Sequence, residues 1–126
     1  MALPFSVDFQ PGAPLTEQLV YAVKKAAISG LLKPGERFPS VRTLSQELRI
    51  NPNTAHKATA ALIADGILVV EPGIGTRMGE IPPGTEEERA QLLGAEAERL
   101  VVEAKALRLA LPDLHNAVET HWRRLS

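Results

Sequence analysis

The sequence predicts a mainly α-helical protein with one small β-hairpin, divided into an N-terminal domain and a C-terminal helical tail. Three observations support this fold class. Apolar residues recur at helical spacing in three segments before residue 66, and a short β-type run with a Pro-Gly turn follows them. Two prolines and two glycines within Gly79–Gly84 then mark a linker. We therefore divide the chain into a domain of residues 1–80 and a tail of residues 84–126.

Composition and charge exclude several classes of protein. The chain has 126 residues, a net charge of −1 and no cysteine, which excludes a disulfide framework, a cysteine zinc site and a thiol nucleophile. Its apolar runs are far shorter than the roughly 20 residues of a membrane span. The N-terminus lacks the basic and long apolar regions of a signal peptide. We expect a cytoplasmic protein that makes no membrane contact.

An arm or strand and a first helix open the N-terminal domain. Apolar residues alternate in Phe5–Phe9, which is typical of a short strand or an extended arm. Apolar positions then recur at helical spacing from Leu15 to Ala27, and Gly30 suits the position after a helix end. We expect this helix from about residue 15 to residue 29, followed by a type II turn over Lys33–Glu36.

Two short helices joined by a tight turn come next. Ser40 can cap a helix over residues 41–48, which would bury Val41, Leu44 and Leu48. Asn51 is a favoured N-cap, and Pro52 suits the first helical position, where an N–H would lack a partner. We predict the second helix from Pro52 to about Asp65. Three of its residues are expected to face the core: Ala55, Ala58 and Leu62.

A β-hairpin completes the domain. Ile67–Glu71 is a β-type run, Pro72–Gly75 a turn, and Thr76–Met78 a return strand. Helix, short helix, tight turn, helix and hairpin, in this order, describe a winged helix-turn-helix.

The start of the helix at residues 52–65 is the candidate recognition site. In a helix-turn-helix, the first residues of the second helix reach base edges, and the preceding helix and the flanks contact phosphates. The Asn53 carboxamide can pair with adenine, and Thr54 can bond a phosphate or touch a thymine methyl, whereas Asn51 is expected mainly as the cap. The candidate DNA-binding residues are Ser40, Arg42, Asn51, Asn53, Thr54, His56, Lys57, Gly73, Thr76 and Arg77.

The charge distribution gives this site modest support. Five basic residues stand against two acidic ones between Lys33 and Lys57, although the whole chain is slightly acidic. In the hairpin, Gly73 would let the backbone approach a minor groove, with the charge of Arg77 nearby.

The tail carries an apolar seam that a chain this short cannot bury alone. Thr85 and Glu88 have the spacing of a capping box. Apolar residues from Ala90 to Leu111 alternate in steps of three and four, and Pro112 breaks the helix and can start another. The tail therefore needs a partner, either the winged domain or a second copy. The candidate dimerisation residues are Leu93, Ala97, Leu100, Ala104, Leu107, Leu111, Leu114, Val118 and Trp122.

Several motifs of the N-terminal domain match those of a known family. They are Pro14-Leu15-x-Glu17-Gln18-Leu19, the run Ile28-Ser29-Gly30-x-Leu32-Lys33-Pro34-Gly35-Glu36-Arg37-Phe38-Pro39-Ser40-x-Arg42-x-Leu44, Asn53-Thr54, Asp65-Gly66-Ile67-Leu68 and Gly73-x-Gly75-Thr76. Over residues 14–78 the chain resembles the GntR-type bacterial transcription regulators. The form Asn51-Pro52-Asn53-Thr54 and a tail of two helices resemble the small YtrA-like subfamily.

The resemblance implies a winged helix-turn-helix, a homodimer joined through the C-terminal helices, and repression of the protein's own operon, often with ABC transporter genes. It supports contacts to DNA from Arg42, Asn53, Thr54, Lys57 and Gly73. The chain carries Pro52 and His56 where many members of the family carry arginine, and Ala55 where a bulky aliphatic residue is usual.

We therefore expect a sequence-specific transcription regulator that binds a palindromic operator in double-stranded DNA as a homodimer. We expect no enzyme activity, cofactor or metal, because His115 and Glu119 lack an evident third ligand and Gly73–Gly75 lacks the further glycine of a phosphate loop. Two alternatives stay open. One is a winged-helix protein-interaction module without specific DNA binding, and the other is a regulator with an unidentified effector between the tail helices.

Overall fold

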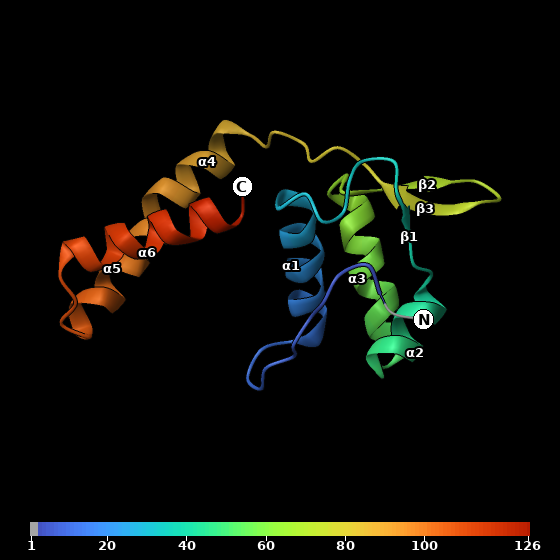
Figure 1. The fold of residues 1–126 in the computed structure, drawn as a ribbon, viewed down its shortest axis with the longest axis horizontal. Helices are drawn as coiled ribbons and strands as arrows, with labels where there is room; N and C mark the ends of the chain where they lie inside the picture. Colours follow the sequence, from blue (N-terminus) through green and yellow to red (C-terminus); the bar gives the residue numbers. More distant parts are fainter. Residues whose placement is uncertain (1–2) are drawn as a thin grey trace. The chain divides into compact units, whose positions relative to one another are not determined.

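The computed structural model describes residues 3–126, which form two compact units that meet between Pro82 and Pro83. We call them the winged domain and the tail; their boundary falls within the predicted linker. The first two residues of the predicted N-terminal domain lie outside the described residues. The elements (Figure 1) are α1 (Leu15–Ile28), β1 (Arg37–Phe38), α2 (Val41–Leu48), α3 (Pro52–Ala64), β2 (Leu68–Glu71), β3 (Gly75–Met78), α4 (Glu86–Gln91), the π-helical segment η1 (Leu92–Glu96), α5 (Ala97–Ala106) and α6 (Leu111–Arg124).

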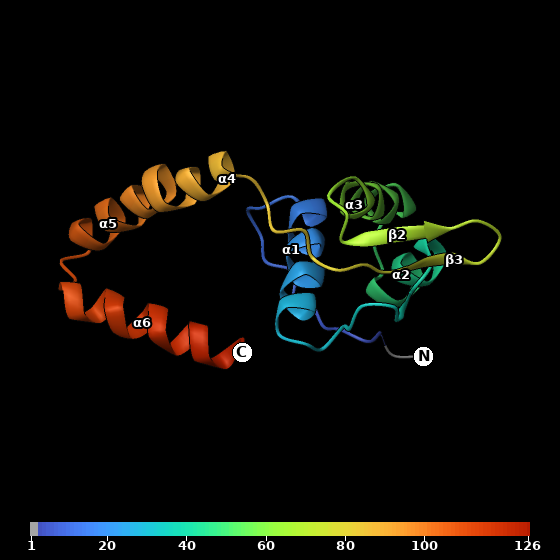
Figure 2. The ribbon, with the colours of Figure 1, turned by 90° about the horizontal axis from the view of Figure 1, so that it is seen from above.

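Three helices enclose the core of the winged domain, with α1 and α2 both packed against α3 (Figures 1 and 2). Leu19, Leu44 and Leu62, one from each helix, are almost fully buried, and each such side chain contributes about 1.5–3 kcal/mol to folding. Ala55 and Ala58 of α3 are buried with Leu62, as the spacing predicts. Val41 and Leu48, two expected core positions, are only half-buried, because they lie at the ends of α2.

A three-stranded antiparallel sheet of order β1-β3-β2 covers one side of the core. Leu68 and Met78 form a cross-strand pair of buried residues in the predicted hairpin. The pairing of β1 with β3, through Phe38 and Thr76, is absent from the sequence prediction. A strand of two residues is too short to show an alternating pattern. Since β1 leads into α2, this pairing ties the hairpin to the start of the helix-turn-helix.

The N-terminal arm is extended and forms no strand, so the second of the two sequence interpretations is right. The Phe5 ring is 6% exposed and stacks on Phe38, with ring centroids 5.9 Å apart and planes 10° from parallel. Gln18 of α1 holds the arm through three hydrogen bonds. Its Nε2 donates to the carbonyls of Gln10 and Ala13, both at 2.9 Å, and its Oε1 accepts from the Gln10 N–H at 2.7 Å.

The first tail helix begins as predicted but ends earlier. The Thr85 hydroxyl accepts from the Glu88 N–H at 3.1 Å, and the Glu88 carboxylate accepts from the Thr85 N–H at 2.9 Å, which confirms the capping box. The helix stops after Ala106 because Arg108 adopts a left-handed φ of 59° and the Leu109 N–H closes back on the Ala104 carbonyl at 2.9 Å.

This early end overturns the single continuous seam predicted for the tail. Leu107 lies at the helix end and Leu111 opens α6, so the two residues do not continue the stripe of α5. The π-helical turn of η1 also shifts the helical register within the stripe. Pro112 stands in the first turn of α6, as predicted. No helix within residues 3–126 is long and apolar enough to cross a membrane.

Candidate nucleic-acid interface

At the first turn of α3, Asn51 caps the helix and Asn53 is an exposed candidate for base contact. The Asn51 Oδ1 accepts the Asn53 N–H at 2.8 Å, and the Asn51 carbonyl accepts the N–H groups of Thr54 and Ala55 at 2.9 and 3.2 Å. Asn51 is therefore occupied as the N-cap. The Asn53 side chain is exposed, and no described residue forms a hydrogen bond with its carboxamide. One asparagine thus shapes the turn and the other points its donor and acceptor away from the protein.

The outer face of α3 carries the other polar residues predicted for DNA contact. His56 and Lys57 are exposed, and Thr54 is half-buried. The opposite face holds Ala55 and Ala58, which are completely buried against the core. Small residues at these two positions let α3 approach its neighbours closely, while the outward face stays polar. Such a helix can enter a major groove without uncovering its core.

The start of α2 combines a capped helix end with an exposed cation. The Ser40 hydroxyl accepts the Thr43 N–H and donates to the Thr43 hydroxyl, both at 3.1 Å, so Ser40 caps the helix. Arg42 is exposed in the first turn, where the positive end of the helix dipole also favours an anion. The Arg42 guanidinium and the backbone N–H groups at the start of α2 both favour a negatively charged ligand.

Two further exposed cations, Arg37 and Arg49, were not among the candidate DNA-binding residues. Arg49 is exposed in the turn between α2 and α3, at a left-handed φ of 54°. Arg37 is exposed on β1, and its Nη1 lies 3.5 Å from the Ile74 carbonyl of the hairpin. Both are part of the basic excess between Lys33 and Lys57, which is the signal that could have found them. The spacing of these basic residues in the sequence does not show where Arg37 and Arg49 lie in the folded domain.

The hairpin, or wing, extends from the body of the winged domain and ends in a glycine-rich tip (Figures 1 and 2). Gly73 and Gly75 have φ values of 77° and 134°, which strain other residues. Thr76 is half-buried against β1. Arg77 forms an ion pair that the sequence does not predict: its Nε lies 3.0 Å from a carboxylate oxygen of Glu71. Its charge is balanced inside the wing.

The tail exposes most of the residues predicted for dimerisation. Leu93 and Trp122 are 79% and 77% exposed, which makes Trp122 no part of a core within the single chain. Leu100, Leu107, Leu111 and Val118 are also exposed, and Ala97 and Leu114 are half-buried. Ala104 is the exception. At 4% exposure it is already covered by its own chain, so it cannot offer surface to a partner.

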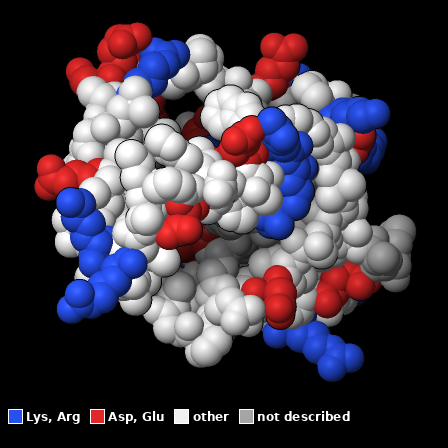
Figure 3. All heavy atoms as spheres, turned by 60° about the vertical axis from the view of Figure 1, so that its left-hand side comes forward, with Lys and Arg blue, Asp and Glu red and all other residues white. Residues whose placement is uncertain are grey.

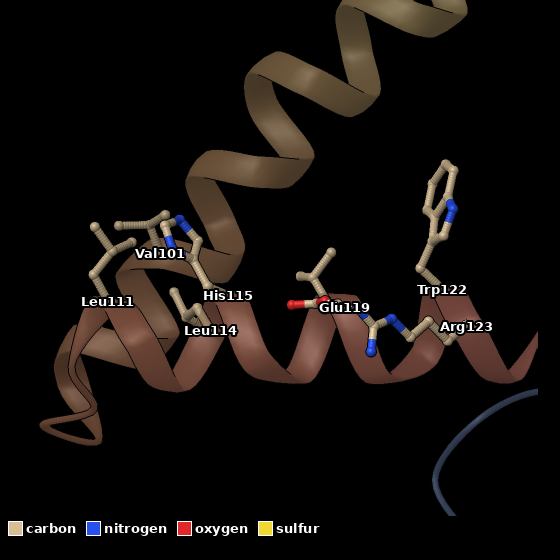
Figure 4. A pocket seen from close by; sticks show the side chains of 8 residues that line it. Val101, Leu111, Leu114, His115, Glu119, Trp122 and Arg123 are labelled. Atoms are coloured by element: carbon tan, nitrogen blue, oxygen red, sulfur yellow. Dashed lines mark ion pairs between the residues drawn. The ribbon is translucent and has the colours of Figure 1, made fainter.

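An apolar groove of about 680 Å³ runs along the tail helices (Figure 4). Val101 of α5 and Leu111, Leu114, Val118 and Trp122 of α6 line it together with three polar residues. Two of these, Glu119 and Arg123, form an ion pair along α6.

Figure 3 shows acidic and basic groups spread among uncharged atoms on one face of the molecule, without a large area of one sign.

Residues 3–126 contain no group of three or more His, Asp or Glu side chains that could hold a metal ion. The sequence pair His115 and Glu119 does not form such a group, and Glu119 pairs with Arg123 instead.

The winged domain, with a capped α3 and a hairpin beside it, has the architecture of a winged helix-turn-helix DNA-binding domain. Residues 15–78 match the family described as "Bacterial regulatory proteins, gntR family". The chain belongs to this family of DNA-binding transcription regulators.

A relative of known sequence agrees with this assignment, and two solved structures share the fold. The "HTH-type transcriptional repressor YtrA" of Bacillus subtilis is 30% identical over 90% of this chain and 88% of its own length. The fold is similar to a crystal structure of a transcriptional antiterminator from Listeria monocytogenes (20% identity, 96% of this chain, 91% of that chain, TM-score 0.83). It is also similar to YtrA from Sulfolobus acidocaldarius, a GntR-family transcription factor (23% identity, 75% of this chain, 96% of that chain, TM-score 0.60). The matched family comprises transcription regulators and not enzymes, as the sequence predicts.

Proposed function

We propose that the protein is a homodimeric repressor that reads a palindromic operator in double-stranded DNA through the first turn of α3. This proposal rests mainly on the different roles of Asn51 and Asn53 in the first turn of α3. Asn51 satisfies the helix end, and the exposed side chain of Asn53 has no hydrogen-bond partner among the described residues. The carboxamide NH₂ of Asn53 can donate to adenine N7 while its oxygen accepts from the adenine N6 amino group. Both ends of the side chain are available for this pairing because neither is bonded within the described residues.

The surrounding cations would hold α3 in the groove. Arg42 lies in the first turn of α2, Arg49 in the turn before α3, and Lys57 one turn along α3 from Asn53. Contacts from these residues to phosphates carry no base information but fix the orientation of the domain. Each neutralised phosphate should lower the logarithm of the binding constant by about 0.9 per logarithmic unit of salt. The salt dependence therefore counts the phosphate contacts.

The tail would join two such domains. Its exposed leucines and Trp122 would be covered by the same surface of a second copy, as a two-fold dimer requires. Two readers related by this symmetry select an inverted repeat with half-site centres about 10 bp apart, or a multiple of this distance.

Repression is proposed from the name of the Bacillus subtilis relative, which is a transcriptional repressor. A dimer bound over a promoter would exclude the polymerase. The first candidate target is the operon that holds the protein's own gene, with ABC transporter genes as further candidates, and the protein would act in the cytoplasm. A small-molecule effector would bind with coupling to DNA affinity, and its identity is left open.

The test compares Asn53→Ala with the unchanged protein on a duplex obtained by selection from randomised DNA. The variant should bind the selected duplex more weakly by about 1–3 kcal/mol, which is roughly 5- to 150-fold, and bind random DNA as before. Asn116→Ala, which removes an exposed carboxamide from α6, is the matched control and should leave both affinities unchanged. An equal loss on random DNA would contradict base reading by Asn53.

A second titration tests DNA binding itself. The unchanged protein is titrated with duplex at two salt concentrations, and its affinity should fall steeply as the salt rises. A flat response would favour the alternative of a winged-helix module that binds another protein.

A further inference from the structure

We infer that Ile74 at the tip of the wing is an apolar wedge that enters the minor groove and unstacks a deformable base step. The inference rests on the proposed function, because it requires the winged domain to lie on DNA. It adds a source of sequence preference that needs no hydrogen bond to a base.

The first observation is the position of Ile74. Its side chain is 56% exposed at the end of the hairpin, between Gly73 and Gly75. A Cβ atom added at either glycine would meet no atom within 4 Å, so the tip is narrow and open on both sides of Ile74. The turn is closed by the Ile74 N–H, which donates to the Glu71 carbonyl at 3.0 Å. A single branched apolar side chain is thus presented on a slender, hydrogen-bonded support.

The second observation is that the wing offers no net charge to DNA. Between Leu68 and Met78 the only ionised side chains are Glu71 and Arg77. They form an ion pair at 3.0 Å, and the Arg77 Nη1 also donates to the Met78 carbonyl at 3.4 Å. The guanidinium is therefore held along the strands and away from the tip. A cation beside the tip comes from β1, where the Arg37 Nη1 lies 3.5 Å from the Ile74 carbonyl, so the hairpin itself adds only apolar contact and backbone groups.

The third observation is that the wing is braced. β3 pairs on one side with β2 and on the other with β1, through Arg37–Arg77 and Phe38–Thr76. β1 continues through Pro39 to Ser40, the N-cap of α2. The tip is consequently fixed with respect to the phosphate-facing start of α2. A wedge must have such a support, because a loose hairpin would bend before the DNA does.

These features match the way in which apolar side chains deform DNA. Proteins that insert a residue such as isoleucine between base pairs from the minor groove open a step and kink the duplex. The cost is a few kcal/mol per step and is lowest at pyrimidine–purine steps, which stack poorly. Ile74 should therefore favour operators that carry TA or CA steps under the wing and disfavour stiff A-tracts there.

The experiment compares three single variants on the selected operator and on a copy whose step under the wing is replaced by an A-tract. Ile74→Ala should weaken binding to the flexible operator by about tenfold, equivalent to 1.4 kcal/mol. It should weaken binding to the A-tract copy by much less, leave the salt slope unchanged and reduce the bend measured by end-to-end fluorescence energy transfer. Val70→Ala removes an aliphatic side chain that is 51% exposed in β2 rather than at the tip, and should change none of these. Glu71→Gln releases Arg77 and should raise both the affinity and the salt slope, the latter by up to about 0.9.

The outcomes separate the wedge from the proposed function. Equal affinities of Ile74→Ala and Val70→Ala for the flexible operator would contradict insertion of Ile74. A DNA bend that persists with Ile74→Ala would contradict it as well. Either result would leave the reading of DNA by α3 intact, provided that Asn53→Ala still loses specific binding. Absence of any specific binding by the unchanged protein would overturn the proposed function and the wedge together.

Discussion

The winged domain and the tail bury their apolar residues to very different extents. Among the described residues, the core of the winged domain takes in 14 buried apolar residues from the arm, all three helices, the sheet and the adjoining loops. Among the described tail residues only Ala104 is buried, so the tail has helices without a core. Helices of this length are marginal in water unless an apolar face is covered. The winged domain can therefore fold by its own contacts, whereas the tail requires a second surface to cover its apolar residues.

The largest effect should come from the arm that seals the core. Phe5→Ala removes a ring that is stacked on Phe38 and should lower the free energy of unfolding of the winged domain by about 3–5 kcal/mol. Urea unfolding followed by circular dichroism measures this loss. Leu93→Ala in the tail serves as the control, since an exposed leucine contributes nothing to that core. A loss below about 1 kcal/mol for Phe5→Ala would show that the arm is dispensable.

A smaller effect is expected where the tail meets its partner. Trp122→Ala should weaken dimerisation by about 2 kcal/mol or more, which is at least 30-fold in the dissociation constant, as for a buried interface tryptophan. Sedimentation equilibrium over a range of concentrations measures it. The control is Glu98→Ala, which removes an exposed polar side chain from α5. Unchanged association of Trp122→Ala would place the dimer interface elsewhere.

The smallest effect is a gain in stability within the winged domain. The Thr59 hydroxyl of α3 is buried and makes no hydrogen bond with any residue of the range 3–126. Replacing it with a methyl group of similar shape in Thr59→Val should raise the free energy of unfolding by about 1 kcal/mol, because an unpaired polar group no longer has to leave water. Thr43→Val is the matched comparison: its hydroxyl is bonded to Ser40 and its loss should not stabilise the protein. If thermal unfolding shows that Thr59→Val is destabilised, the hydroxyl has a partner that these contacts do not include.

The parts of the fold that the sequence predicts correctly are those set by local chemistry. Ser40, Asn51 and the capping box at Thr85 mark helix starts within one turn, because a cap contacts only the next three residues. The end of α5 was missed since Arg108, a residue that rarely takes a left-handed φ, closes the helix well before Pro112.

Long-range contacts explain the remaining differences. The stacking of Phe5 on Phe38 and the pairing of β1 with β3 join segments far apart in the chain, and neither leaves a periodic pattern. In the candidate site, too, local features could be predicted and long-range contacts could not. The exposure of Asn53 follows from helical spacing around a predicted cap, but the neutralisation of Arg77 by Glu71 depends on the register of the hairpin.

The most direct test of the account is the selection of bound sequences from a library of fully randomised duplexes by the full-length protein. If α3 reads bases and the tail pairs two domains, the enriched sequences will form an inverted repeat, with half-site centres about 10 bp apart or a multiple of this. Enrichment of a single unrepeated site would contradict the pairing of two readers by the tail, and no enrichment at all would contradict base reading by α3.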